Sequence, residues 1–171
     1  VPPSVRARLE AGADETPKPG DPRLARASAT IIATPRQALE AATAKARALG
    51  YEPVVLGDRV EGEAREVGRE HARMALDLAK KGGKPRAILS GGELTVTIRG
   101  EGRGGPNAEY MMAMALALDG APGIHALAGD TDGIDGSEDN AGGLITPDTL
   151  ARAHAKGMDI AAMLDVNDSY E

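Results

Sequence analysis

The sequence predicts an α/β fold: a three-layer sandwich with a mostly parallel central sheet and an antiparallel strand at one edge. Short apolar segments alternate along the chain with amphipathic helical segments, which is typical of a parallel sheet with helices on both faces. Glycine-rich or acidic stretches follow several of the expected strands, and ligands of such sheets bind at the carboxyl ends of the strands. The 171 residues suffice for a core of their own.

Five strands are expected, and each is identified by a short apolar or alternating run. They cover residues 29–33, 53–56, 86–89, 94–98 and 124–128. The segment 94–98 alternates threonine with apolar residues, so we expect it to be the antiparallel edge strand.

Helices are expected over residues 34–49, 61–81, 107–119, 146–156 and 160–164. Thr34 and Pro35 provide an N-cap followed by proline at the first helical position. The segment 107–119 is apolar almost all round, which predicts a helix buried between layers, with its methionines filling the core.

The composition excludes several classes of protein. Charged residues make up 27% and hydrophobic residues 42% of the chain, which fits a globular protein. The net charge of -6 and the lack of a basic stripe argue against a nucleic-acid partner, and no apolar run approaches the roughly 20 residues of a membrane span. The absence of cysteine excludes disulfides and thiol catalysis and suits a cytoplasmic protein.

The chain is expected to divide into two parts. Residues 1–23 look like the end of a preceding domain and a linker, because residues 12–23 place prolines and glycines among charges. Residues 24–171 form the predicted α/β domain, which we expect to be truncated at its C-terminus.

Residues 100–105 (GEGRGG) match the pattern GxGxxG between an expected strand and an expected helix. Three interpretations are open: a dinucleotide-binding loop, a flexible edge loop, and an anion cradle. The cradle would combine backbone N–H groups, the N-terminus of helix 107–119 and Arg103. We favour it because the preceding strand alternates, unlike the buried first strand of a dinucleotide-binding unit.

Two further stretches are candidates for the site. Ser90-Gly91-Gly92-Glu93 would allow a ligand to approach the backbone closely, or would form a β-bulge. Residues 130–139 hold five carboxylates without the EF-hand spacing. That loop is either a solvated acidic turn or a Mg²⁺ site, with Asp132 and Asp135 as the ligands. His71 and His125 are expected to be core residues.

The run GGELTVTIRGEGRGGPNAEY (91–110), followed by GDTDGIDG and Asn140-Ala141-Gly142-Gly143, resembles the C-terminal MOFRL domain of glycerate 2-kinases. Members of that family are often labelled hydroxypyruvate reductases. The likeness covers about residues 24–171. It implies ATP-dependent phosphorylation of D-glycerate at the 2-hydroxyl with Mg²⁺, in a cleft shared with a missing N-terminal domain. This chain alone is then expected to be inactive.

The resemblance also implies roles for individual residues. Asp132 and Glu109 would be catalytic, and Asp132 and Asp135 would bind the metal. Pro106 stands where many relatives have arginine, so either Arg103 contacts phosphate instead or the phosphate contact is weaker in this chain. The implied substrate- and phosphate-binding residues are Gly91, Gly92, Glu93, Thr95, Gly102, Arg103, Gly104, Gly105, Asn107, Thr131 and Gly133.

Two other functions stay open: an NAD(P)H-dependent hydroxypyruvate reductase and a non-catalytic module that binds a phosphometabolite. The three loops contain no lysine, so a cation that contacts the transferred phosphate is expected to come from the missing half. A homodimer is also left open.

Overall fold

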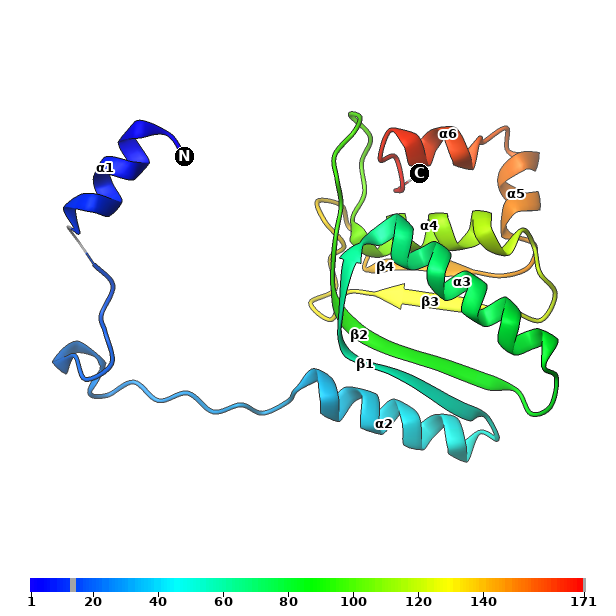
Figure 1. The fold of residues 1–171 in the computed structure, drawn as a ribbon, viewed down its shortest axis with the longest axis horizontal. Helices are drawn as coiled ribbons and strands as arrows, with labels where there is room; N and C mark the ends of the chain where they lie inside the picture. The colour runs from blue at the N-terminus through cyan, green and yellow to red at the C-terminus, as the bar shows by residue number, and fades with distance from the viewer. Residues whose placement is uncertain (13–14, 171) are drawn as a thin grey trace. The chain divides into compact units, whose positions relative to one another are not determined.

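The computed structural model describes residues 1–12 and 15–170, which fall into two compact units. The first unit, residues 1–33, contains α1 (Pro3–Ala11) and a short 3₁₀ helix, η1 (Pro22–Leu24). The second unit, residues 34–171, holds all the other elements (Figure 1). Among the described residues, no helix has the length and apolar character needed to cross a membrane.

The second unit alternates helices with strands in chain order. The elements are α2 (Pro35–Ala48), β1 (Glu52–Glu63), α3 (Ala64–Lys80), β2 (Arg86–Thr95), α4 (Pro106–Leu118), β3 (Ala126–Gly129), β4 (Gly142–Ile145), α5 (Thr149–Ala155) and α6 (Ile160–Asp165). All five predicted helices are present, and Thr34 caps α2 as expected by accepting from the backbone N–H of Gln37.

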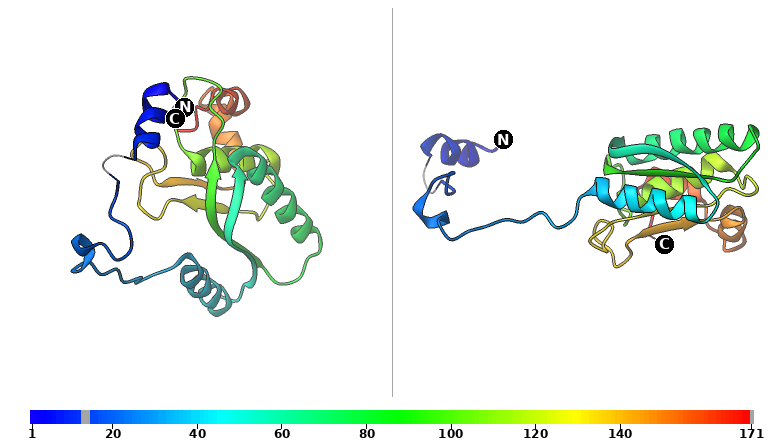
Figure 2. Two further views of the ribbon diagram at one scale, coloured as in Figure 1. Left: turned by 60° about the vertical axis from the view of Figure 1, so that its left-hand side comes forward. Right: turned by 90° about the horizontal axis from the view of Figure 1, so that it is seen from below.

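The strands form two pairs. Strands β1 and β2 are parallel, with Glu52 opposite Arg86 and Glu63 opposite Thr95, and β3 and β4 are antiparallel. Helix α2 packs on the β1–β2 pair, whereas α3 and α4 pack on each other and α4 packs on β3 and β4 (Figures 1 and 2). The predicted α/β class with parallel pairing and an antiparallel strand is therefore confirmed.

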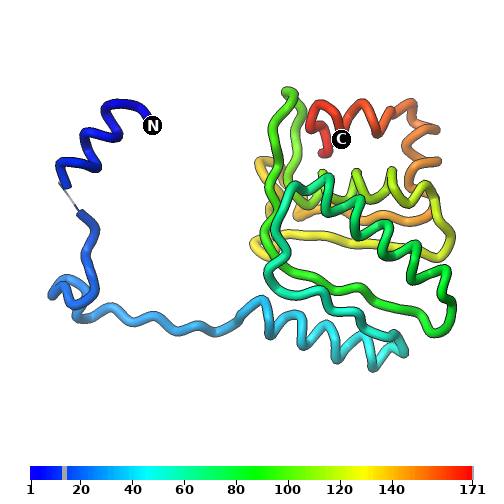
Figure 3. Tube along the Cα trace, in the orientation of Figure 1, coloured from blue at the N-terminus to red at the C-terminus, as the bar shows by residue number. Residues whose placement is uncertain are grey.

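The strands themselves differ from the prediction in five places: β1 continues to Glu63, β4 was not predicted, and three further segments differ as follows. Residues 90–93, expected to be a loop, belong to β2. The loop that extends beyond the strands begins only after the end of β2, and it leads back to α4 (Figure 3). The segment 94–98 is not an antiparallel strand, because Leu94 and Thr95 end β2 in parallel pairing with β1. Residues 29–33 form no strand and leave Ile31 and Ile32 exposed.

The core lies where α4 meets α3 and β4. Its buried residues are Ala72, Met111, Met114, Ala115, Leu118 and Ile145. With no phenylalanine or tryptophan in the chain, methionine supplies the bulk, as the sequence predicted. Helix α4 thus packs into the core along its length, and Pro106 and Asn107 of its first turn line the same pocket as the ends of β2 and β3.

Candidate functional site

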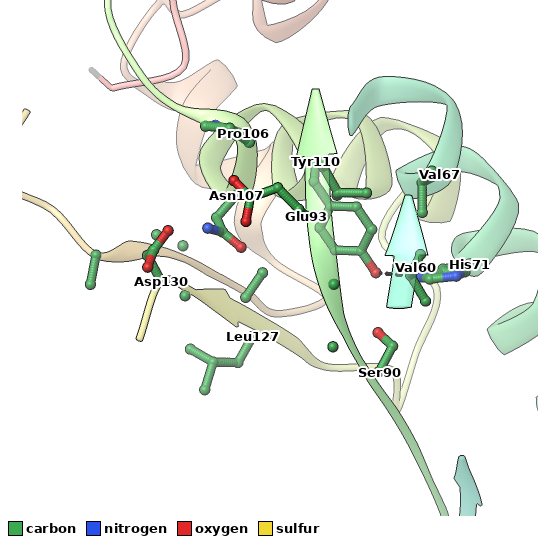
Figure 4. Close-up of a pocket in the computed structure, with 18 of the residues that line it drawn as sticks. Val60, Val67, His71, Ser90, Glu93, Pro106, Asn107, Tyr110, Leu127 and Asp130 are labelled. Carbon is green, nitrogen blue, oxygen red and sulfur yellow. Dashed lines mark hydrogen bonds between the residues drawn. The ribbon is translucent and has the colours of Figure 1, made fainter. Parts of the chain in front are cut away.

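A pocket of about 640 Å³ lies between β2 and β3. Its lining combines residues 90–94 of β2, residues 127–130 at the end of β3 and residues 141–144 at β4. Helices α3 and α4 and the end of β1 complete the lining with Val60, Val67, His71, Pro106, Asn107 and Tyr110 (Figure 4). The structure thus brings the first glycine motif and the start of the acidic loop to one place, whereas the sequence had suggested that the GxGxxG loop would join them there.

Oxygen-bearing side chains gather at the carboxyl-end side of this pocket. Glu93 comes from the end of β2, Asn107 from the first turn of α4, and Asp130 directly follows β3. Figure 4 shows the carboxylates of Glu93 and Asp130 on the same side of the pocket as the amide of Asn107. None of the described lining residues is lysine or arginine. This end of the pocket therefore presents mainly hydrogen-bond acceptors.

Tyr110 and His71 form the other polar feature. The Tyr110 hydroxyl lies 2.9 Å from His71 Nδ1, and the two rings meet edge to face. Burial raises the pKa of Tyr110 to about 12 and lowers the pKa of His71, so both groups are neutral near pH 7. The sequence placed His71 in the core; its spacing gave no sign that the side chain borders a pocket.

The two glycines of the first motif have different requirements. At Gly92 the backbone φ is 155°, and a Cβ atom would lie 2.0 Å from the Val60 carbonyl oxygen. At Gly91 the nearest atom would be 3.8 Å away, an ordinary contact. The β1–β2 register is irregular between Gly57 and Val60, opposite this point. Gly92 is therefore needed for the close approach of the two strands.

The GxGxxG loop lies outside the pocket, because the chain's own C-terminal segment packs into it. A Cβ atom on Gly100 would lie 2.6 Å from Val166 Cα, and one on Gly104 would lie 2.1 Å from Ser169 Oγ. The N–H of Gly102 donates to the Val166 carbonyl at 3.0 Å. The close packing of residues 166–169 against the loop explains these glycines, and the Gly102 N–H is already bonded within the chain.

Arg103, in the same loop, contacts neighbouring side chains. Its Nη1 lies 3.4 Å from Glu138 Oε2, and its guanidinium carbon lies 4.9 Å from the centre of the Tyr170 ring. It is not among the residues that line the pocket. A phosphate contact by Arg103 remains a prediction.

The predicted anion position at the N-terminus of α4 is occupied by a carboxylate of the chain itself. Asp135 Oδ1 accepts from the backbone N–H of Asn107 at 2.9 Å and from Asn107 Nδ2 at 3.1 Å, and Oδ2 accepts from the Ala108 N–H at 2.7 Å. The Asp135 side chain is fully buried. It therefore satisfies the first turn of the helix, as a capping residue does.

Glu109 is also buried and fully paired. Its Oε1 accepts from Arg65 Nε at 2.8 Å and its Oε2 from Asn167 Nδ2 at 2.8 Å. Thr95, likewise outside the pocket lining, donates through Oγ1 to the Gly62 carbonyl at 3.2 Å. The geometry gives Glu109 and Thr95 structural contacts, and their predicted functional roles stay predictions.

The predicted residues Thr131, Asp132 and Gly133 lie beside the pocket. They are exposed and are not part of its lining. The backbone N–H of Asp132 donates to Asp130 Oδ1 at 3.1 Å, which joins this loop to the pocket wall. Gly102, Gly104 and Gly105 are absent from the lining as well. Asp130, Gly142 and Gly143 line the pocket although they were not among the predicted site residues.

Two carboxylates, those of Glu93 and Asp130, line the pocket. Among the described residues, no group of three or more His, Cys, Asp or Glu side chains could hold a metal ion. Glu93 and Asp130 line the same pocket, and Mg²⁺ in proteins is commonly held by one or two carboxylates, with water and substrate oxygens completing its shell.

Comparison with known proteins shows which families the chain resembles. The profile of the MOFRL family matches residues 86–171. A protein from Agrobacterium vitis that is provisionally named a hydroxypyruvate reductase is 50% identical over 175 residues, which cover 99% of this chain and 39% of that protein. A glycerate 2-kinase from Pyrococcus horikoshii is 33% identical and aligns with all of this chain and 40% of its own length.

A solved structure agrees with these relatives. The crystal structure of a glycerate kinase from Thermotoga maritima superposes with a TM-score of 0.78 at 33% identity, over 82% of this chain and 35% of that one. The chain spans about two fifths of the length of the relatives named here. The profile match covers half of the chain, and the fold agrees with it: the chain belongs to the MOFRL family.

Proposed function

We propose that this chain is the C-terminal part of an ATP-dependent glycerate 2-kinase, and that it supplies one wall of an active site shared with an N-terminal domain. The pocket between β2 and β3 carries the proposal. It joins Glu93, Asn107 and Asp130 at the carboxyl ends of two strands, where ligands of α/β sheets bind. Two of the relatives described above are named glycerate kinases, which supports the same reaction.

The proposed reaction transfers the γ-phosphoryl group of ATP to D-glycerate. The 2-hydroxyl oxygen forms a bond to the γ-phosphorus while the bond from that phosphorus to the ADP oxygen breaks. The products are 2-phosphoglycerate, ADP and one proton. Mg²⁺, when bound, would neutralise charge on the transferred phosphate.

The residues of this chain would have separate roles. Asp132 is exposed beside the pocket, so it could accept the proton of the reacting hydroxyl once a second domain closes over it. Glu93 and Asp130 would hold Mg²⁺, and Gly91 would leave room for the substrate. Asp135 and Glu109 would support the helix instead, because their oxygens are already taken by internal donors. Cations that stabilise the phosphate would come from the other domain.

The alternative is the reductase activity in the name of the Agrobacterium vitis relative. A nicotinamide dinucleotide would need a phosphate-binding loop. The GxGxxG loop is packed against residues 166–169, and the adjacent helix N-terminus is capped by Asp135. The geometry therefore favours the kinase. The cytoplasmic location stays a prediction from composition.

The intact protein would be assayed with D-glycerate, ATP and Mg²⁺. We expect ADP release without any nicotinamide cofactor, and we expect enolase to consume the product, since enolase accepts 2-phosphoglycerate. Oxidation of NADH or NADPH by hydroxypyruvate, with no ADP formed, would establish the reductase instead. Binding of phosphometabolites without either turnover would point to a regulatory module.

Variants then test the site. We expect Glu93→Gln and Asp132→Asn each to lower kcat by about 100-fold or more, in line with the loss of a positioned acid or base. Asp77→Asn is the matched control, because Asp77 pairs with Lys80 on the exposed face of α3, away from the pocket lining. Retention of full activity by both site variants would remove the pocket from the proposal.

A further inference from the structure

Asp135 makes one contact that helix capping alone does not need. The backbone N–H groups of Asn107 and Ala108 already satisfy its two oxygens as a cap. Asn107 Nδ2 adds a third donor, 3.1 Å from Oδ1. Three donors converge on the two oxygens, so both oxygens act as acceptors. The contact therefore fixes the orientation of the Asn107 amide, with its nitrogen toward Asp135.

The chain is built to allow this approach. A Cβ atom on Gly105 would lie 2.4 Å from the Asp135 carbonyl oxygen and 2.5 Å from Asp135 Cγ. On the other side, a Cβ atom on Gly136 would lie 2.4 Å from the Gly104 carbonyl oxygen, and Gly136 has a φ of 77°. Two glycine positions thus let the acidic loop seat its carboxylate against the first turn of α4.

With its nitrogen held by Asp135, the Asn107 amide turns its oxygen toward the pocket. Figure 4 shows this amide facing the same space as Glu93 and Asp130. All three residues line the pocket. An amide oxygen accepts a hydrogen bond without ever taking the proton. It therefore suits a hydroxyl group that must be bound but not deprotonated, whereas a carboxylate suits the hydroxyl that reacts.

We infer that Asn107, held by Asp135 as a positioning residue, accepts a hydrogen bond from the non-reacting 3-hydroxyl of the acceptor and so selects acids that carry a second hydroxyl. The inference rests on the proposed function, since it names the acceptor of the same site. A site built to bind a hydroxyl rejects the analogue that lacks it, because the half-buried Asn107 oxygen is then left without that partner.

The test compares D-glycerate with D-lactate, which keeps the 2-hydroxyl and lacks the 3-hydroxyl. The wild-type intact protein should use D-glycerate at least about 100-fold better in kcat/KM. Asn107→Ala should lower kcat/KM for D-glycerate by about 10- to 100-fold, mainly through KM, and change the value for D-lactate by less than about threefold. Asp135→Asn should act in the same direction, because one amide oxygen then meets three donors.

Asp159→Asn is the matched control. Asp159 caps α6 by accepting from the Ala162 N–H at 3.1 Å, and it is not among the residues that line the pocket. A purely structural role for Asp135 predicts that both aspartate variants lower the melting temperature and leave the preference for D-glycerate intact. That result, or equal losses on both acids in Asn107→Ala, would overturn the inference.

Direct binding separates this inference from the kinase proposal. Calorimetry of the intact protein with D-glycerate and with D-lactate needs no turnover. If the wild type binds D-glycerate more tightly than D-lactate, if Asn107→Ala loses this preference, and if no phosphorylation is seen, the inference would stand and the kinase proposal would be wrong. Equal binding of the two acids by the wild type would sink the inference even if D-glycerate is phosphorylated.

Discussion

Arg65 of α3 and Glu109 of α4 form an ion pair inside the protein, with Nε 2.8 Å from Oε1 and side-chain exposures of 1% and 2%. Arg65 Nη2 also donates to the Leu164 carbonyl at 2.9 Å, and Asn167 Nδ2 donates to Glu109 Oε2 at 2.8 Å. The hydrogen bond to Glu109 raises the pKa of Arg65. The pair therefore connects two helices to the C-terminal segment, which in turn packs against the GxGxxG loop.

Breaking this pair should destabilise the protein strongly. Glu109→Ala removes the hydrogen-bonded carboxylate and leaves the buried Arg65 with only Glu63, whose Oε1 lies 4.0 Å from Nε, so we expect the free energy of unfolding to fall by about 3 kcal/mol in urea titrations. Glu66→Gln is the control, because the Arg69–Glu66 pair is largely exposed, and it should cost less than about 1 kcal/mol. If Glu109→Ala lowered the free energy of unfolding as little as Glu66→Gln does, another group would have replaced Glu109 as the partner of Arg65.

The adjacent glycines of the first motif should respond differently to alanine. A methyl group at Gly92 would collide with the Val60 carbonyl, and its backbone φ of 155° disfavours any side chain. We expect Gly92→Ala to cost about 2 kcal/mol or more. Gly91→Ala meets nothing closer than 3.8 Å and should change stability by less than about 1 kcal/mol. Thermal unfolding of the two variants decides, and equal stability would contradict the tight β1–β2 approach.

His71 should make the stability of the protein depend on pH below neutrality. Burial lowers its pKa below the ordinary value of 6.5, so the unfolded chain takes up a proton before the folded chain does. The free energy of unfolding gained from neutral His71 is therefore fully present above pH 6.5 and falls as the pH drops through that value toward the lowered pKa.

The measurement is urea unfolding at several values from pH 7.5 to pH 5 for the wild type and His71→Gln. We expect the difference between the two proteins to shrink as the pH falls, because glutamine does not titrate. Parallel curves across this range would show that burial does not penalise protonation of His71.

Local sequence signals predicted the helices well and the strands less well. Thr34, Pro35 and the apolar periodicity of 107–119 act within one element, so their effect is readable from the sequence alone. Residues 57–63 at the end of β1 contain glycines and charges that are typical of a loop, and only the pairing with β2 makes them a strand. Residues 29–33 have strand composition but no pairing partner, and an unpaired strand is not stable.

The same limit explains the site. Sequence patterns located the glycine and acidic loops, and the structure brings Gly91, Gly92, Glu93 and Asn107 into one pocket. The sequence patterns could not show that the carboxylate oxygens of Asp135 and Glu109 accept hydrogen bonds from donors inside the protein, because those contacts join residues 27 to 58 positions apart in the chain. A carboxylate next to a glycine motif looks the same in the sequence whether it faces a ligand or a helix.

The last prediction concerns residues 1–171 alone, which should fold but not phosphorylate D-glycerate. The core around Met111, Met114 and Leu118 belongs to the second unit and needs no further domain, so cooperative thermal unfolding is expected. Transfer of a phosphoryl group needs charge stabilisation from more than one side. The described pocket lining offers Glu93 and Asp130 and neither lysine nor arginine, so ATP would meet repulsion unless Mg²⁺ is bound. An open pocket also leaves these charges in contact with water, which weakens each electrostatic contact. We therefore expect weak, Mg²⁺-dependent nucleotide binding by calorimetry and no ADP release, with some activity restored by the N-terminal domain added in trans. Turnover by residues 1–171 at the rate of the intact protein would place the whole active site in this chain.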